Sequence, residues 1–536
     1  MKIVYKKISD TLNEALKKEY DVSLEQPLWE VPPQQEFGDF SSMVALKLAS
    51  RLKKDPLEIA SNIKSFLEKS LSKDVDKIEI LRPGFINIFI SRSSLIGYLN
   101  AVIKNEENFF RGKEGKKILI EFLSANPTGP LSIAHGRQAI VGDVIANILE
   151  FCGNKISRDY YLNDAGRQID LFAQSIINVS KALEDNKEDL SSVIPEGGYK
   201  GDYIKDIAAD FLSKASKTDA KTFGIKSMLA NIKKDLKSLG IKKFDRWFSQ
   251  DKLIKEGKIK EVVDVLKDKG LIYEKEDAVW FEATKFGDDK DRVIKKADGE
   301  LTYFASDIAY HRKKCREGYD MLINLWGPDH HGYIKRVESA IAALGNKKEI
   351  LKIVIVQLVT LKTKERMSKR AGTAILLSDL INDIGRDAAR FYYITRKNSS
   401  HLEFDIDLAK KSSFDNPLYY IQYVCARIES IFRKAKISSF NSTFSKHLRL
   451  PEEISLLRTL LQFSYCLKKA ECSLEPTFII EFLKNLASSF HKFYEKIRVI
   501  DDDKSLTAAR LNLLEAVRVV FHCGLGLLGI TPAKKM

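Results

Sequence analysis

The sequence predicts an α/β multidomain protein, with a small α+β N-terminal domain, a Rossmann-type parallel-sheet core that carries a helical insertion, and an all-α C-terminal bundle. Three observations support this prediction. The 536 residues suffice for roughly three or four ordinary domains. A strand, a glycine-rich turn and a helix follow one another from Ile118 to Leu149, which is the first unit of a doubly wound sheet. Beyond about residue 385, apolar residues recur at helical spacing.

Composition restricts the class of protein without identifying it. The net charge is +15 and the pI is about 9.2, a balance that attracts polyanions such as nucleic acids. A basic surface with no nucleic-acid role explains it equally well. No apolar run approaches the ~20 residues that span a bilayer, and the start lacks the pattern of a secretory signal. The six cysteines show no zinc-site spacing, so we expect a cytoplasmic protein with no membrane segment and no structural metal.

Residues 1–112 predict the small α+β domain. Residues 39–52 place apolar side chains on one face of a helix. Pro83-Gly84 then forms a turn before residues 85–90, a short apolar run rich in strand formers. The charged stretch 104–117 marks the end of this domain.

Residues 113–385 predict the parallel-sheet core. Ile118–Phe122 is a short buried strand, followed by a turn rich in proline and glycine and by an amphipathic helix that runs to Leu149. The lysine-rich and mostly helical stretch at about 170–275 is interpreted as an insertion. The alternation of strands and helices then resumes with 303–310, 321–326 and 353–359.

Residues 386–536 predict the helical bundle. Apolar residues recur there at steps of three and four, which is the spacing of one helix face. The clearest series are Phe482, Leu486, Phe490 and Phe493, and Leu511, Leu514, Val517 and Phe521.

Two segments far apart in the sequence have features that suit phosphate groups. In the first, residues 121–137, the triplet Ala134, His135 and Gly136 stands at the start of the helix that follows the first core strand. Small residues there let phosphates approach the backbone, and the helix amides favour anions. His135 can donate a hydrogen bond to a phosphate oxygen, although a lone histidine after a turn is more often structural.

The second segment is Met367-Ser368-Lys369-Arg370. It follows an apolar strand predicted at 353–361 and precedes Gly372, so a glycine-bearing loop could close over phosphates and bring Lys369 to them. The alternative is a solvated basic loop with no such role.

Together the two segments resemble the HIGH and KMSKS signatures of class I aminoacyl-tRNA synthetases. Residues 126–137, Asn-Pro-Thr-Gly-Pro-Leu-x-x-x-His-Gly-Arg, are similar to the arginyl-tRNA synthetase version of the first. Ser132 replaces the opening histidine of HIGH, and Ala134 replaces its glycine. In the second signature, Lys369 matches the second lysine and Arg366 replaces the first.

Further blocks extend this resemblance over nearly the whole chain, in the order of the family. They are 160–166, 281–292, 326–333, 387–390 (a DALR-like start to the helical domain), 416–427 and 527–536. A chance match at one block is easy, whereas matches at all of them in order are not.

The resemblance implies an enzyme that ligates L-arginine to its cognate tRNA through an arginyl-adenylate, with ATP and Mg²⁺ as Mg-ATP. It also implies an anticodon-binding role for the helical domain, and a monomer, as is often found in the family. A non-catalytic RNA-binding paralogue and a different nucleotidyltransferase are the alternatives. Retention of His135 and Lys369 argues against the paralogue, and the helical C-terminal third argues against the other nucleotidyltransferase.

The resemblance also assigns site residues by motif position. Catalytic roles go to Ser132, His135 and Lys369. Ser132 cannot carry positive charge. Either Ser132 and Lys369 together suffice to stabilise the phosphate charge, or Arg137 contributes part of that stabilisation. The ATP-binding positions are Ser132, His135, Gly136, Asp329, His330, Met367, Ser368 and Lys369. The arginine-binding positions are Glu121, Ser124, Asn126, Tyr303 and Asp307, and the tRNA-binding positions are Phe85 and Asn87.

Some of these positions have simpler interpretations. Tyr303 could merely pack, and Asp307 could cap a helix. His330 and His331 are adjacent, but adjacent side chains point apart on a strand and no further ligand stands at zinc spacing. We therefore expect no metal site there.

Overall fold

The structure, a computed structural model, describes residues 4–214, 219–362, 375–436 and 439–536. These residues divide into two compact units. The first consists of residues 1–113, 147–152 and 408–536, and the second of residues 114–146 and 153–407. The domain boundaries expected from the sequence, after residues 112 and 385, remain predictions.

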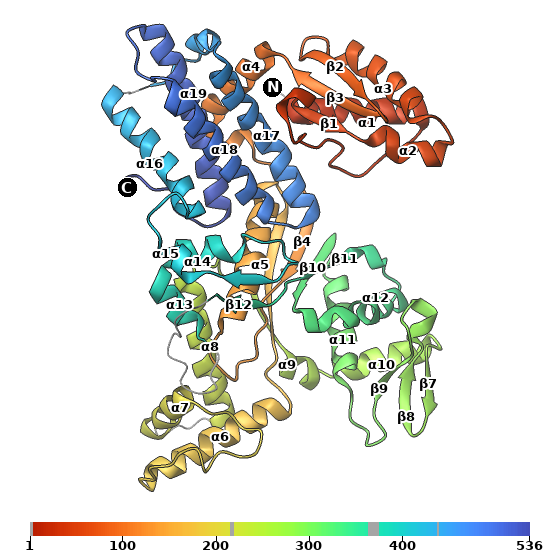
Figure 1. Ribbon diagram of the computed structural model, residues 1–536. Helices are drawn as coiled ribbons and strands as arrows, with labels where there is room; N and C mark the ends of the chain where they lie inside the picture. Colours follow the sequence, from red (N-terminus) through yellow and green to blue (C-terminus); the bar gives the residue numbers. More distant parts are fainter. Residues whose placement is uncertain (1–3, 215–218, 363–374, 437–438) are drawn as a thin grey trace. The chain divides into compact units, whose positions relative to one another are not determined.

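The N-terminal part of the first unit contains a three-stranded antiparallel sheet in the order β1-β3-β2 (Figure 1). Its central strand buries Ile86, Ile88 and Ile90. Asp55 starts one of the helices beside it by accepting a hydrogen bond from the backbone N–H of Leu57. The elements are α1 (Val4–Tyr20), β1 (Phe40–Ser42), α2 (Val44–Leu52), α3 (Pro56–Leu71), β2 (Val75–Leu81), β3 (Phe85–Ile90) and α4 (Arg92–Asn105).

The predicted turn at 83–84 and strand at 85–90 are confirmed. The helix predicted over 39–52 begins only at Val44. Phe40–Ser42 instead form β1, because they pair with Ile86–Ile88 of β3. That partner is distant in the sequence, and local periodicity does not register it.

Helices dominate the C-terminal part of the same unit, as predicted. The apolar series from Phe482 to Phe493 is buried. Asn416 and Asp503 cap two of the helices with their side chains. The long helices are α16 (Pro417–Ala435), α17 (Pro451–Ser473), α18 (Thr477–Lys496) and α19 (Lys504–Leu527).

The second unit contains a five-stranded parallel sheet in the order β11-β10-β4-β5-β6. The buried strand β4 lies at its centre and places Ile120 between Ile323 of β10 and Arg158 of β5. The predicted parallel-sheet core is thereby confirmed. The strands are β4 (Lys117–Glu121), β5 (Lys155–Leu162), β6 (Arg246–Ser249), β10 (Met321–Trp326) and β11 (Leu351–Ile355), and α5 (Ile133–Phe151) connects β4 to β5.

The stretch predicted as a helical insertion is only partly one. Three helices, α6 (Arg167–Glu184), α7 (Asp202–Ser213) and α8 (Ala220–Ser238), share a core around Phe172 and Met228. The chain then returns to the sheet as β6, where Trp247 stacks on Tyr160 of β5 at 4.2 Å between ring centroids. The interpretation of all of 170–275 as an insertion was therefore too broad.

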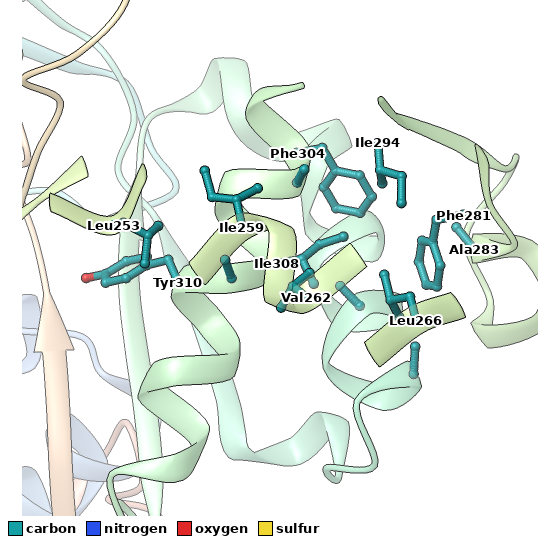
Figure 2. Packing of buried hydrophobic residues seen from close by; sticks show 14 of the residues in the cluster. Leu253, Ile259, Val262, Leu266, Phe281, Ala283, Ile294, Phe304, Ile308 and Tyr310 are labelled. Atoms are coloured by element: carbon teal, nitrogen blue, oxygen red, sulfur yellow. The ribbon is translucent and has the colours of Figure 1, made fainter. Parts of the chain in front are cut away.

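A second apolar core holds the helix α11 (Tyr303–Arg316) in place. Figure 2 shows Phe304 and Ile308 of this helix in one cluster with Leu266 and Phe281, and Tyr310 beside Leu253. The surrounding elements are α9 (Gln250–Lys255), α10 (Lys258–Asp268), α12 (Ile334–Ala343) and an antiparallel sheet of β7 (Ile272–Lys275), β8 (Ala278–Phe281) and β9 (Arg292–Lys295). The packing fixes which face of α11 turns toward β4.

The end of the second unit differs from the prediction in one strand. The run 353–361 is divided between β11 and a separate strand β12 (Val359–Leu361), which pairs with β13 (Leu402–Phe404). The remaining helices are α13 (Leu377–Ile384), α14 (Arg386–Tyr393) and α15 (Ile406–Lys410), the last of which leads into the first unit. Within the described ranges, no helix is long and apolar enough to span a membrane.

A buried ion pair joins two elements of the second unit. Arg390 of α14 and Asp143 of α5 lie 2.6 Å apart, and both side chains are at most 1% exposed. Arg390 also donates to the backbone carbonyl of Leu239 at 3.0 Å. Removal of Arg390 would withdraw a charge-assisted hydrogen bond from the buried carboxylate of Asp143.

We expect Arg390→Met to lower the free energy of unfolding of the second unit by about 3–5 kcal/mol, as measured by urea denaturation. The matched control is Arg386→Met on the same helix, where an exposed pair with Asp387 at 3.0 Å should contribute less than about 1 kcal/mol. Equal losses in the two variants would contradict the buried-pair explanation.

Candidate active site

The turn between β4 and α5 lies at the carboxyl end of the central strand, where doubly wound sheets bind ligands. Leu123 and Ser124 adopt positive φ angles of 71° and 41°, a conformation that costs of order 1 kcal/mol or more for residues other than glycine. Strand β5 holds the turn in place. Tyr160 donates to the carbonyl of Ala125 at 2.7 Å, and the Ser124 hydroxyl accepts from the Tyr161 N–H at 3.0 Å.

His135 lies in the first turn of α5 and has a defined tautomer. The backbone N–H of Ser132 donates to His135 Nδ1 at 3.0 Å, and the Ser132 hydroxyl lies 3.1 Å from the same nitrogen. Since Nδ1 accepts, the ring proton sits on Nε2. Burial lowers the pKa of His135. The residue therefore presents a neutral N–H donor, and Ser132 orients it.

Gly136 is needed for packing rather than for access to the backbone. A Cβ atom at this position would lie 2.7 Å from the Tyr393 hydroxyl and 2.6 Å from Leu377. Tyr393 in turn donates to the carbonyl of Ile133 at 2.8 Å. Of the small residues predicted to admit phosphates, only Ala134 is exposed.

Arg137 has a structural role. Its side chain is fully buried and donates to the backbone carbonyls of Gln357, Ser400 and Lys397 at 2.8–2.9 Å. The hypothesis that Arg137 helps to stabilise the phosphate charge was wrong, because its guanidinium binds backbone carbonyls of the segments next to β12 and β13.

Glu121, the last residue of β4, is buried among hydrogen-bond donors. Its Oε2 accepts from Tyr310 at 2.8 Å and from the ammonium of Lys314. Burial alone would raise the pKa of Glu121, but the adjacent Lys314 outweighs it and lowers the pKa below the usual value. Glu121 is therefore ionised, with Oε1 facing the hydroxyl of Ser124 at 3.5 Å.

Asp307 lies on α11, whose N-cap is Thr302, so the simpler interpretation of Asp307 as a cap was wrong. Tyr333 donates to its Oδ2, and Oδ1 accepts no hydrogen bond from a described residue. Burial raises the pKa of Asp307 to about 6, and the negative charge of Glu121 adds to the shift. Tyr303, one helical turn earlier, is 68% exposed rather than packed in the core.

Three buried polar residues that the sequence analysis missed connect these carboxyl groups. Lys314 donates to Asn324 Oδ1 at 3.0 Å, Asn324 Nδ2 lies 3.0 Å from His311 Nε2, and His311 Nδ1 lies 2.9 Å from the carbonyl of Asp307. Burial, together with the charge of Lys314, lowers the pKa of His311 to about 4. An asparagine inside the apolar run Met-Leu-Ile-Asn-Leu-Trp was the signal that could have revealed them.

The other predicted positions are at the surface of this unit. Asn126 donates to Gln168 at 2.8 Å. Asp329 and His330 follow β10 in a 3-10 helix, Pro328–Tyr333. His330 Nδ1 lies 3.2 Å from Asp329 Oδ2. His331 is in the same helix, not on a strand. Among the described residues, no group of three potential ligands could hold a metal ion.

The second signature lies in a part of the chain that the structure does not describe. Met367, Ser368 and Lys369, together with Arg366 and Arg370, are outside the described residues. Their predicted contacts with ATP therefore stay predictions.

Phe85 and Asn87 are in the first unit, where they border a pocket of about 190 Å³. A larger hollow shares Phe37, Leu81 and Asn87 with it. Asn87 Oδ1 accepts from Ser41 at 2.6 Å, so its amide nitrogen is left as the donor. Leu81 is 46% exposed, and the pocket thus combines an apolar wall with one oriented amide.

Comparisons with known proteins agree with this architecture. Residues 98–408 match the catalytic domain of class I (R) tRNA synthetases, residues 4–90 match the arginyl tRNA synthetase N-terminal domain, and residues 421–536 match the DALR anticodon binding domain. The arginine–tRNA ligase of Thermotoga petrophila is 40% identical over 99% of both chains. That of Citrifermentans bemidjiense is 41% identical over 95% of this chain and 94% of its own.

Solved structures show the same fold. The Thermus thermophilus arginyl-tRNA synthetase superposes with a TM-score of 0.82 at 19% identity, covering 99% of this chain and all of the other. The Plasmodium falciparum arginyl-tRNA synthetase gives a TM-score of 0.75 at 19% identity, covering both chains fully. With the sequence relatives, these matches show that the chain belongs to the arginyl-tRNA synthetases, class I enzymes that ligate arginine to tRNA.

Proposed function

We propose that this chain joins L-arginine to its cognate tRNA at the carboxyl end of β4, and that the pocket between β4 and α11 binds the arginine side chain. The observation that carries the proposal is the pair Glu121 and Asp307. They come from different elements, and the hydrogen-bonded chain of Lys314, Asn324 and His311 connects Glu121 to the backbone carbonyl of Asp307. Each retains a carboxylate oxygen without a strong partner among the described residues.

The first step is attack of the arginine carboxylate on the α-phosphorus of ATP. A carboxyl oxygen forms a bond to phosphorus, the bond from that phosphorus to the bridging oxygen breaks, and pyrophosphate leaves. A ribose hydroxyl of the tRNA then attacks the carbonyl carbon, gives up its proton and displaces AMP. The protein forms no covalent intermediate, so it acts by positioning the reactants and stabilising charge.

A guanidinium needs planar, charge-assisted hydrogen bonds. We assign these to Glu121 Oε1 and Asp307 Oδ1, and we assign Tyr303, which stands exposed at the start of α11, to the aliphatic part of the substrate. Ser124 and Asn126, on the β4–α5 turn, would contact its amino and carboxylate end.

We assign the phosphates of ATP to the start of α5. His135 offers its Nε2–H, and Ser132 acts by holding the ring. Asp329 and His330 would contact adenosine or the arginine amino group, and Lys369, by its motif position, would supply positive charge. Mg²⁺ bound to the phosphates would add charge when Mg-ATP is the substrate.

The first unit would bind tRNA. The pocket beside Phe85 has the size of a single base. The Phe85 ring would stack on that base, and the Asn87 amide would donate to an acceptor on the edge of the base. The helical residues 386–536 would bind the anticodon. We further propose that the enzyme works as a monomer in the cytoplasm.

We expect Lys369→Ala to slow tRNA charging about 100- to 1000-fold, because a lost donor to a charged transition state has an effect of that size. The measurement is acid-precipitable labelled arginine on tRNA. Lys352→Ala, an exposed lysine of β11, is the control and should charge normally. A well-folded wild-type chain that does not charge tRNA would instead favour a non-catalytic RNA-binding paralogue.

The raised pKa of Asp307 predicts a pH dependence. Only ionised Asp307 pairs with the guanidinium, so kcat/KM for arginine should fall as the pH drops through about 6. Asp307→Asn should show a low kcat/KM without this limb. Asp298→Asn, at an exposed turn, should keep it. An Asp307→Asn profile that still falls through the same pH would assign the limb to another group.

Phe85→Ala should raise the KM for tRNA at least about fivefold, because stacking of one base contributes about 1–3 kcal/mol. The KM for arginine should stay unchanged in the same charging assay. Asn62→Ala on α3, which removes an exposed amide bonded to Tyr20, is the control. Equal changes in both constants would indicate a general folding defect instead of a tRNA contact.

A further inference from the structure

Lys314 is a lysine with no exposed surface, placed beside the arginine pocket. Its side chain is 0% exposed and pairs with Glu121, and its Nζ lies 4.2 Å from the centroid of the Tyr310 ring. A buried ammonium carries a desolvation cost of several kcal/mol unless its partners compensate for it. The fold therefore retains this cation at a position where an apolar residue would be less costly.

The partners of Lys314 leave only one arrangement of protons. The carbonyl of Asp307 can only accept, so His311 Nδ1 carries the proton and His311 Nε2 accepts from Asn324 Nδ2. Asn324 Oδ1 must then face Lys314, which can only donate. The chain is satisfied with His311 neutral, in agreement with its lowered pKa.

The charged side chains around Glu121 and Asp307 differ in their ion pairs. Lys314 compensates Glu121. Arg246 is shared by Asp159 and Glu317, with its Nε 2.9 Å from Asp159 Oδ1 and its Nη1 2.7 Å from Glu317 Oε1. Asp307 forms no ion pair with a described residue. Among Glu121, Lys314 and Asp307, one negative charge is therefore left without an ion-pair partner among the described residues, and it lies on Asp307.

We propose that Lys314 is a positioning residue that balances the charge of Glu121, so that Asp307 is left as the unpaired charge, and that orients Glu121 as a hydrogen-bond acceptor. The pocket then matches a planar monocation, whose single charge is balanced by Asp307 while Glu121 accepts its N–H groups. Without Lys314, the buried Glu121 takes up a proton and turns from an acceptor into a donor that repels guanidinium N–H groups. This inference rests on the proposed function and adds a specificity-determining residue to it.

The test is Lys314→Met, assayed by charging with saturating tRNA. The KM for arginine should rise at least about tenfold, because one partner of a buried pair is removed, while the KM for ATP stays within about twofold. Lys313→Met is the matched control. It removes the adjacent, partly exposed lysine of α11 and should change neither constant. An unchanged arginine KM in Lys314→Met would overturn the proposal, as would an equal rise for ATP.

A double-mutant cycle separates positioning from a general structural role. If Lys314 acts through Glu121, then Lys314→Met should raise the arginine KM by less than about threefold in the Glu121→Gln background. Equal effects in the two backgrounds would mean that Lys314 acts independently of Glu121, and the proposal would be wrong.

A second variant covers the case in which Lys314→Met does not fold. Asn324→Ser keeps the ammonium but removes its hydrogen-bond acceptor, and should raise the arginine KM about threefold or more without affecting ATP. An unchanged arginine KM in this variant would overturn the proposal. A wild-type chain that cannot charge tRNA contradicts the proposed function itself, whereas normal charging with unaffected variants contradicts only the role of Lys314.

Discussion

The alignment of β4 with β10 is the constraint on which the site depends. In this parallel pair, Glu121 lies directly opposite Asn324, so the carboxyl end of the central strand carries two polar side chains side by side. A shift of either strand by one residue would turn its polar side chain to the other face of the sheet and separate the two. The register therefore decides whether Lys314 can reach both of them, and the apolar residues Leu119 and Leu322 hold that register by their burial.

Helix α11 supplies the remaining parts of the site from one face. Asp307, His311 and Lys314 recur at steps of four and three residues, so they share the side of the helix that faces β4 and β10. An adjacent side of the helix packs into the apolar core that contains Phe304 and Ile308 (Figure 2). Packing on one side and a polar network on the other together leave the helix little freedom to rotate, which keeps the carboxyl groups at a defined spacing.

Local patterns in the sequence predicted most of the architecture but not its long-range pairings. Glu121 and Asp307 could be found because each stands in a motif, and α5 because its periodicity is strong. Strands β1 and β6 were missed because three or four residues carry too weak a local signal, and their pairing partners are far along the chain. Arg137 was misjudged for a related reason. A guanidinium bound to three carbonyls has the same sequence signature as one that binds phosphate.

The two histidines near the site, His135 and His311, are both neutral. Contacts at Nδ1 and burial keep His135 neutral, and the Asn324 contact with burial does the same for His311. Arg137 is committed to backbone carbonyls, and Lys314 is committed to Glu121. None of these groups can therefore balance the charge that develops on the phosphates as pyrophosphate leaves. In the proposed reaction, Lys369 and ATP-bound Mg²⁺ would therefore supply the larger share of the positive charge, and His135 would orient the phosphates.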